Sequence, residues 1–190
     1  MIKVTDNFLE VDEFQFVETN FIQPEFPWFL SQVLDPNCDD LACAWEDNVQ
    51  LCHLLYNAPQ TSADGKESNG EYQFIVSPIT SKLNSLIPLR IKANLGFKSG
   101  KIIKHGFHTD IPDRILDLKC CETAIFYLNT NNGYTEFEDG TKVESVANRL
   151  VTFPSHIKHT GTTCTDQPYR IVINFNYVGV VDGKKIDYVD

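Results

Sequence analysis

The sequence predicts a mainly β protein in which N-terminal helices flank a double-sheet jelly roll. Two observations lead to this fold class. From Leu89 onward, short runs rich in β-branched and aromatic residues alternate with turn signals such as Asp139-Gly140. Before that point, apolar residues instead recur at helical spacing. A chain of 190 residues can bury one substantial core and is too short for two comfortable domains.

We therefore expect a single domain over residues 1–190. Its expected parts are a helical support region at 1–88, a jelly-roll core at 89–177 and a C-terminal tail at 178–190. Residues 57–70 are rich in turn-forming residues and lack apolar periodicity, which predicts a surface loop.

Two helices are expected in the support region. The first covers about residues 11–21, where acidic residues near the start suit a helix N-terminus. Its apolar stripe is Val11, Phe14, Val17 and Phe21. The second begins at Ser77-Pro78, because proline is well tolerated in the first turn. Its expected apolar stripe is Ile79, Leu83, Leu86 and Ile87.

Eight short strands are expected in the core. They lie at 89–97, 102–109, 121–129, 134–137, 141–146, 149–153, 157–163 and 169–177. The last alternates most clearly, because side chains of a strand point to opposite faces in turn. One face carries Ile171, Ile173, Phe175 and Tyr177, and the other carries Arg170, Val172, Asn174 and Asn176. A cation and two amides inside a barrel are costly unless they bind something.

The net charge, the lengths of the apolar runs and the N-terminal segment indicate which partners and which location to expect. A net charge of −10 repels a phosphate backbone, so nucleic acid is disfavoured as a partner. A local basic cluster is interpreted as a solvated hairpin. It consists of Arg90, Lys92, Lys98, Lys101 and Lys104. No apolar run reaches the ~20 residues of a membrane span, and no signal peptide is recognised, so we expect a soluble cytoplasmic protein without a membrane partner.

Six cysteines are interpreted as reduced, mostly buried apolar residues, because no export signal accompanies them. They are Cys38, Cys43, Cys52, Cys120, Cys121 and Cys164. Their spacing does not favour a structural zinc site.

Three residues form a candidate metal site. His108 and Asp110 lie two apart on an expected strand and therefore share a face. His159 follows 51 residues later, at another expected strand. Two imidazoles and one carboxylate leave coordination positions open, as in non-haem Fe(II) oxygenases. Arg170 follows, and its guanidinium suits the far carboxylate of a bidentate 2-oxo acid.

Other histidines compete for these roles. His105 has no acid two residues after it, and His156 lies within a Pro-Ser turn, whereas a strand holds His159 more rigidly. His105 and His156 then lie beside the ligands or at the rim, or are plain exposed histidines. His53, in an apolar context interpreted as helical, is expected to be structural.

A series of motifs runs through nearly the whole chain. They are Val4-Thr-Asp-Asn-Phe-Leu9, Phe26-Pro-Trp28, Arg90-Ile-Lys-Ala-Asn94, His105-Gly-Phe-His-Thr-Asp110, Ile125-Phe-Tyr-Leu-Asn129, Asn132-Gly-Tyr-Thr-Glu-Phe137, Asn148-Arg-Leu-Val-Thr-Phe153 and Arg170-Ile-Val-Ile-Asn-Phe-Asn176. Together they resemble the 2-oxoglutarate/Fe(II) oxygenases, specifically the prolyl 4-hydroxylase-like branch and its small phage-encoded members. The resemblance implies a double-stranded β-helix with iron and cosubstrate at its open end.

The resemblance also implies roles for individual residues. The implied iron ligands are His108, Asp110 and His159. Arg170 matches the residue that binds the far carboxylate of 2-oxoglutarate, and Tyr127 matches a tyrosine whose hydroxyl assists that carboxylate. Asn94 is expected to contact cosubstrate or substrate, and Asn176 to line the pocket beyond Arg170. The chain departs from the pattern at Gly96-Phe97, near where prolyl hydroxylases usually place a tyrosine.

The implied activity is hydroxylation that consumes 2-oxoglutarate and O2 at Fe(II) and releases succinate and CO2, with ascorbate as a candidate reductant. Asp110 separates the chain from the halogenases. The resemblance implies that halogenases have a small residue in place of this carboxylate. A peptidyl proline is the first expected substrate, a small metabolite or free amino acid the second, and nucleic acid the third.

Two other classes remain open from the sequence: a binding or structural jelly roll without metal, and a cupin-like zinc or manganese enzyme. If the gene is phage-encoded, the expected location is the host cytoplasm. The oligomeric state is left open.

Overall fold

The computed structural model describes residues 1–32, 49–59, 61, 68–83, 85–111 and 120–179. The strands are β1 (Lys3–Thr5), β2 (Phe29–Gln32), β3 (Val49–Asn57), β4 (Ser68–Asn69), β5 (Ser85–Phe97), β6 (Cys121–Tyr127), β7 (Tyr134–Phe137), β8 (Lys142–Glu144), β9 (Arg149–Pro154), β10 (His159–Gly161) and β11 (Tyr169–Gly179). The helices are α1 (Val11–Ile22), α2 (Ser77–Lys82) and the 3-10 helix η1 (Gln73–Val76).

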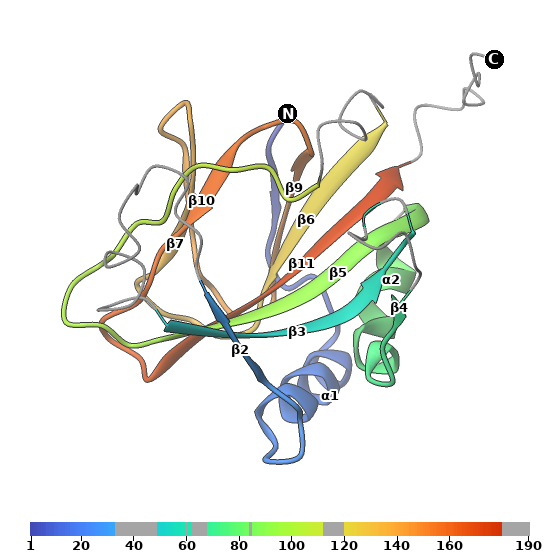
Figure 1. The fold of residues 1–190 in the computed structure, drawn as a ribbon, viewed down its shortest axis with the longest axis horizontal. Coiled ribbons are helices and arrows are strands. Elements are labelled where there is room, and N and C mark those ends of the chain that lie inside the picture. Colours follow the sequence, from blue (N-terminus) through green and yellow to red (C-terminus); the bar gives the residue numbers. More distant parts are fainter. Residues whose placement is uncertain (33–48, 60, 62–67, 84, 112–119, 180–190) are drawn as a thin grey trace.

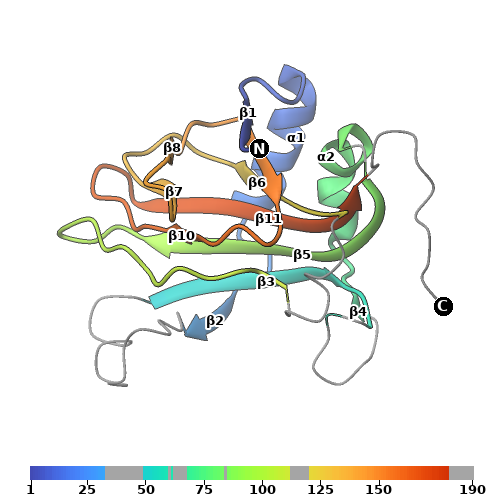
Figure 2. The same ribbon diagram turned by 90° about the horizontal axis from the view of Figure 1, so that it is seen from above.

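Two antiparallel sheets face each other. The larger has the order β1-β9-β6-β11-β5-β3-β2, with β4 beside β3, and the smaller has the order β10-β7-β8. Helices α1 and α2 cover one side of the larger sheet, while β7 and β10 lie on its other side (Figure 1). Figure 2 shows β11, β5 and β3 side by side through the middle of the molecule. The predicted fold class, a jelly roll flanked by helices, is confirmed.

Helix α1 matches the predicted helix and extends one residue further, to Ile22. A capping box closes its start, where the Glu10 amide donates to Glu13 Oε2 at 3.0 Å. Val17 and Phe21 on its inner face are buried in the main core, against the apolar face of the large sheet. The apolar spacing therefore identified the packed face correctly.

The second helix is shorter than predicted, and this part of the prediction is wrong. Helix α2 ends where the Leu83 amide donates to Ile79 O and the backbone becomes extended. Leu86 and Ile87 belong instead to β5, whose first residue is Ser85. The cause is tertiary, because β11 pairs with β5 over almost its whole length, down to the Gly179–Ser85 pair.

The region at 1–88 is less helical than predicted. Strand β1 pairs with β9, and β3 pairs with both β2 and β5, so this region supplies strands to the large sheet. His53 therefore lies on a strand and not in a helix. It is buried, its Nδ1 lies 2.7 Å from Pro27 O, and its ring packs on Phe26, which agrees with a structural role.

The predicted strand at 102–109 is also wrong. Among the described residues this segment makes only isolated bridges, Lys104 with Thr162 and His108 with His159. The two bridges do not share one register, and the Thr160 hydroxyl donates to the His105 carbonyl. A continuous ladder needs one register, so the segment stays irregular. The seven other predicted strands are present: the strand at 134–137 has the predicted ends, and each of the other six differs at one or both ends.

Strand β11 has the predicted alternation. Its apolar set is buried with α1 in the main core, and it consists of Ile171, Ile173, Phe175 and Tyr177. The opposite face looks toward the smaller sheet, and Arg170, Val172 and Asn174 line a cavity there. One face of β11 thus packs beneath the helices, and the other face lines the cavity.

Other expectations are tested only in part. Cys52, Cys120, Cys121 and Cys164 are free thiols, as predicted, whereas Cys38 and Cys43 lie outside the described residues. Half of the predicted loop at 57–70, and all of the tail at 178–190 except Val178 and Gly179, lie outside them as well. None of the helices that the structure describes is long and apolar enough to cross a membrane.

Candidate metal and cosubstrate site

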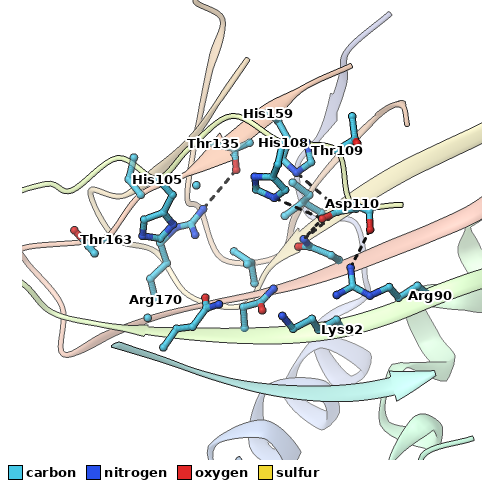
Figure 3. Close-up of a pocket in the computed structure, with 18 residues that line it drawn as sticks. Arg90, Lys92, His105, His108, Thr109, Asp110, Thr135, His159, Thr163 and Arg170 are labelled. Carbon is cyan, nitrogen blue, oxygen red and sulfur yellow. Dashed lines mark hydrogen bonds and ion pairs between the residues drawn. The ribbon is translucent and has the colours of Figure 1, made fainter. Parts of the chain in front are cut away.

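A cavity of about 320 Å³ opens between the two sheets. Strands β5 and β11 form its floor, and most of its wall comes from β7, β10 with the residues after it, and the irregular segment 105–110 (Figure 3). Gln50 of β3 and Ile125 of β6 also line it. Its volume lies within the range of about 300–1,000 Å³ that is usual for small-molecule sites.

Three side chains converge in this cavity, although they come from distant parts of the chain. The candidate ligand atoms of His108, Asp110 and His159 all lie within 4.8 Å of one another. Reciprocal backbone hydrogen bonds of 3.0 Å between His108 and His159 bring the irregular segment and β10 together. The local β bridge, and not a regular strand, therefore positions the His-x-Asp motif.

The separations fit a metal ion better than a direct contact. Asp110 Oδ1 lies 3.7 Å from His108 Nε2, and Asp110 Oδ2 lies 3.8 Å from His159 Nε2. Both are too long for hydrogen bonds. Two ligands at ~2.1 Å from one ion can be at most ~4.2 Å apart, so both Asp110–histidine separations leave room for an ion. The 4.8 Å spread of all three atoms requires them to move slightly closer together around it. That the three residues bind iron stays a prediction.

Asp110 is held as an anion. Its side chain is only 5% exposed, and burial by itself raises the pKa of the carboxyl. The two imidazoles when protonated, the permanent charge of Arg90 and a hydrogen bond from Asn176 outweigh this effect, so the pKa of Asp110 is lowered overall. Amide groups of Asn174 and Asn176 each lie 3.3 Å from Oδ2 and hold that oxygen in place. A fixed carboxylate is a suitable ligand for a divalent cation.

His159 is held in its neutral form. Its side chain is 3% exposed, and burial lowers the pKa of the imidazole. The ring packs on Phe153, with centroids 4.9 Å apart, which fixes its plane. Only a neutral imidazole offers a lone pair to a metal, so the apolar surroundings favour a ligand role.

Arg170 is a buried cation that faces the same cavity. It is 7% exposed, Nε donates to Ser145 Oγ at 2.8 Å, and Nη2 lies 3.5 Å from Thr135 Oγ1. In the part of the chain that the structure describes, no carboxylate pairs with Arg170. A buried charge without a counterion is costly, so the position suits an anionic ligand.

Small residues leave room around this guanidinium. Gly96 is the cross-strand partner of Arg170, and a Cβ added at Gly96 would have no atom within 4 Å. The departure at Gly96-Phe97 from the tyrosine usual in prolyl hydroxylases thus leaves open space. Gly133 is different, because an added Cβ there would lie 2.7 Å from Arg170 Cδ.

Tyr127 lies beside the cavity, and the role that the resemblance implies for its hydroxyl stays a prediction. The side chain is fully buried beneath the cavity wall, and its hydroxyl donates to Thr135 Oγ1 at 2.8 Å. Thr135 lines the cavity, whereas Tyr127 does not. The Tyr127 ring also lies under the Arg170 guanidinium, 5.7 Å from its centroid. Tyr127 therefore contacts both Arg170 and Thr135, which line the cavity.

The two predicted asparagines have different surroundings. Asn94 lines the cavity from β5, as expected. Asn176 donates to Thr123 Oγ1 and approaches Asp110, so it holds the carboxylate and is not part of the cavity lining. Of the two competing histidines, His105 lines the cavity and His156 is exposed outside it.

The interpretation of the basic cluster as a solvated hairpin is wrong for two of its members. Arg90 and Lys92 lie on the inner face of β5 and line the cavity, whereas Lys98, Lys101 and Lys104 are exposed. Sequence reasoning also missed Thr135 and Ser145, the hydroxyl partners of Arg170. For Arg90 and Lys92 the sequence did contain a signal. They alternate with apolar residues and share one strand face with Asn94, which was expected to face the cavity.

Comparison with known proteins gives matches at the level of structure. No protein-family model matches the chain, and no curated protein matches its sequence. Solved structures do match over most of the chain. One is a 2OG-Fe(II) oxygenase family oxidoreductase from Burkholderia pseudomallei, with TM-score 0.64 and 9% identity, covering 93% of this chain and 84% of that one.

Two prolyl hydroxylases also match. The enzyme from Trichoplax adhaerens, in complex with a peptide fragment of hypoxia inducible factor, has TM-score 0.58 and 18% identity, covering 93% of this chain and 83% of that one. The viral collagen prolyl hydroxylase of Paramecium Bursaria Chlorella virus-1, in a 2OG complex, has TM-score 0.54 and 13% identity. The match covers 94% of this chain and 96% of the viral one. The chain thus has the fold seen in 2-oxoglutarate oxygenases, including prolyl hydroxylases.

Proposed function

We propose that this protein is an Fe(II)- and 2-oxoglutarate-dependent dioxygenase that hydroxylates its substrate. One observation carries the proposal: a His-Asp-His set and a buried arginine without a carboxylate partner share one cavity. In this proposal His108, Asp110 and His159 hold the metal. A plain binding jelly roll has no need for this combination of buried charges.

Each residue then has a physical task. Asn174 and Asn176 hold the Asp110 carboxylate through their amide groups. Arg170, fixed by Ser145 Oγ, binds the far carboxylate of 2-oxoglutarate. When bound, Fe(II), 2-oxoglutarate and O2 supply the oxidation, which inserts one oxygen atom into a C–H bond and releases succinate and CO2. The protein supplies geometry and a shielded cavity.

A peptidyl proline is the first candidate substrate. The likeness to prolyl hydroxylases supports it, as does the peptide bound in the Trichoplax adhaerens structure. A small metabolite or free amino acid is the second candidate. Nucleic acid is disfavoured by the net charge of −10.

A mass-spectrometric screen for a 16 Da gain tests the function. Proline-containing peptides and small molecules are incubated with the protein, Fe(II), 2-oxoglutarate and ascorbate as reductant, and succinate is quantified in parallel. We expect one substrate class to gain ~16 Da, the mass of one inserted oxygen atom, together with succinate. The His108→Ala variant should yield neither. No succinate from the iron-loaded wild type with any substrate would contradict the proposal.

A further inference from the structure

We propose that Arg90 and Lys92 form a subsite for a carboxylate of the substrate, at the opposite end of the cavity from Arg170. The inference rests on the proposed function and adds a substrate class to it. It concerns two cations of β5: Lys92, which has no task in the site as described so far, and Arg90, which so far only neighbours Asp110.

The β5–β11 register separates the two cationic ends. Arg170 pairs with Gly96, whereas Arg90 pairs with Asn176, six residues further along the ladder. At ~3.3 Å per residue this corresponds to ~20 Å between the backbone positions. Lys92 pairs with Asn174, which contacts Asp110. In Figure 3, Arg170 and Arg90 lie on opposite sides of the three candidate ligands, with Lys92 below them.

Neither cation forms an ion pair with a carboxylate among the residues that the structure describes, although both lie close enough to Asp110 to interact with its charge. Arg90 Nη1 donates to the backbone carbonyl of Asp110 at 3.2 Å, which orients the guanidinium beside the metal site. Lys92 has no hydrogen bond or ion pair with any described residue, although it is only half exposed and faces the cavity.

Two like charges on adjacent inward positions of one strand repel each other. Burial lowers the pKa of Lys92 and the charge of Arg90 adds to this effect, while Cys52 and Asp110 oppose it, so that the pKa is lowered overall. A bound anion would offset both the desolvation and the repulsion. The arrangement therefore costs stability in the free protein and gains it back when an anion binds.

The cosubstrate can occupy only one of these ends. Its 2-oxo acid end is expected at the metal, and its other carboxylate then reaches a single cation. Arg170 suits it better, because the side chain is buried and held by the hydroxyls of Ser145 and Thr135. The Arg90–Lys92 end then remains for the second molecule in the cavity, which is the substrate.

The chemistry of the pair favours a carboxylate. The planar guanidinium of Arg90 can donate two parallel hydrogen bonds to one carboxylate, and the Lys92 ammonium adds a compact positive charge beside it. The carboxylate can be that of a free amino or organic acid, or an Asp or Glu side chain beside a target proline. A polyanion is disfavoured, because the protein as a whole carries a net charge of −10.

Matched ligands test the proposal by calorimetric binding to Mn(II)- and 2-oxoglutarate-loaded protein. The first pair is L-proline and L-prolinamide; the second is acetyl-Glu-Pro-Gly amide and acetyl-Gln-Pro-Gly amide. We expect the carboxylate form of at least one pair to bind ~10-fold or more tightly, because a charge-assisted hydrogen bond is worth ~1.5–3 kcal/mol. The pair that discriminates identifies the source of the carboxylate. No preference in either pair overturns the proposal.

Variants assign the preference to the two cations. Lys92→Gln should abolish the preference for the carboxylate form, with Kd for 2-oxoglutarate unchanged. Arg90→Gln should abolish the preference as well, and its Kd for Mn(II) is measured in parallel, because Arg90 also donates to the backbone of Asp110. Lys101→Gln removes an exposed charge of the same cluster and is the control. If Lys92→Gln instead weakens 2-oxoglutarate binding and Arg170→Gln does not, the subsite belongs to the cosubstrate and the proposal is wrong. Wild-type protein that binds neither Mn(II) nor 2-oxoglutarate would refute the proposed function itself.

Thermal unfolding of the metal-free protein tests Lys92 without any bound Mn(II) or 2-oxoglutarate. Because Lys92 has no described partner, Lys92→Gln should leave Tm unchanged or raise it. A lower Tm would indicate a structural role for the Lys92 ammonium and would count against a binding subsite.

Discussion

At the scale of single residues, the account depends on Asp110 and the groups that hold it. A carboxylate that is 5% exposed stays ionised here because neighbouring charges outweigh burial. Asn174 and Asn176 approach the same oxygen, and their own carbonyl oxygens have no hydrogen-bond partner among the described residues. The two amides are therefore oriented toward Asp110 at a cost, which is expected where a ligand must be held in one orientation.

Replacing Asn176 by alanine tests this positioning role. Loss of its amide frees Asp110 Oδ2 on one side, and groups that orient metal ligands typically contribute 10–100-fold in affinity. We expect Asn176→Ala to weaken Mn(II) binding ~10-fold by calorimetry. Asn20→Ala, on helix α1 and outside the cavity lining, is the matched control and should bind as wild type does. Equal Mn(II) affinity in all three proteins would show that Asn176 does not position Asp110.

At the scale of elements, β11 contributes to both the core and the site, and α1 packs on its core face. The apolar face of β11 packs with α1, and its polar face lines the cavity, so the core fixes the position of Arg170. The same alternation was readable from the sequence. What the sequence did not show is how far β5 extends, because its first residues form a strand only through pairing with β11.

Two phenylalanines of α1 test the packing. Phe21 is fully buried in the core, whereas Phe16 on the same helix is 42% exposed. Phe21→Ala should lower the free energy of unfolding by ~3–5 kcal/mol, because the truncation leaves a cavity. Phe16→Ala should cost ~1 kcal/mol or less. Urea unfolding measures both values, and similar losses in the two variants would show that α1 is packed differently.

The glycine before β7 tests the space around Arg170. An alanine at position 133 would place Cβ 2.7 Å from Arg170 Cδ and 2.8 Å from Thr163 O, so the guanidinium must move. We expect Gly133→Ala to raise Kd for 2-oxoglutarate ~10-fold or more, because charge-assisted hydrogen bonds depend on geometry. Mn(II) affinity should not change. Gly100→Ala, with no atom within 4 Å of the added Cβ, is the control and should behave as wild type.

At the scale of the whole molecule, the sequence predicted the fold class and the residues that converge, but not every neighbour. The motif around His108 and Asp110 was recognised on a strand that does not exist, because a two-residue bridge to β10 replaces it. Lys92 was misread because strand polarity alone does not say which face a second sheet covers. Ser145 was missed because its contact with Arg170 joins positions 25 residues apart. Such contacts depend on tertiary packing.

The central claim is that one cavity holds Fe(II) through three side chains and 2-oxoglutarate through Arg170. Anaerobic titration of the protein with Fe(II) and 2-oxoglutarate tests it most directly, because a 2-oxo acid bound to Fe(II) gives a weak visible charge-transfer band. We expect this band in the wild type, its loss in His108→Ala, and a large rise in the 2-oxoglutarate concentration required in Arg170→Gln. Absence of the band in the wild type, or an unchanged titration in both variants, would contradict the account.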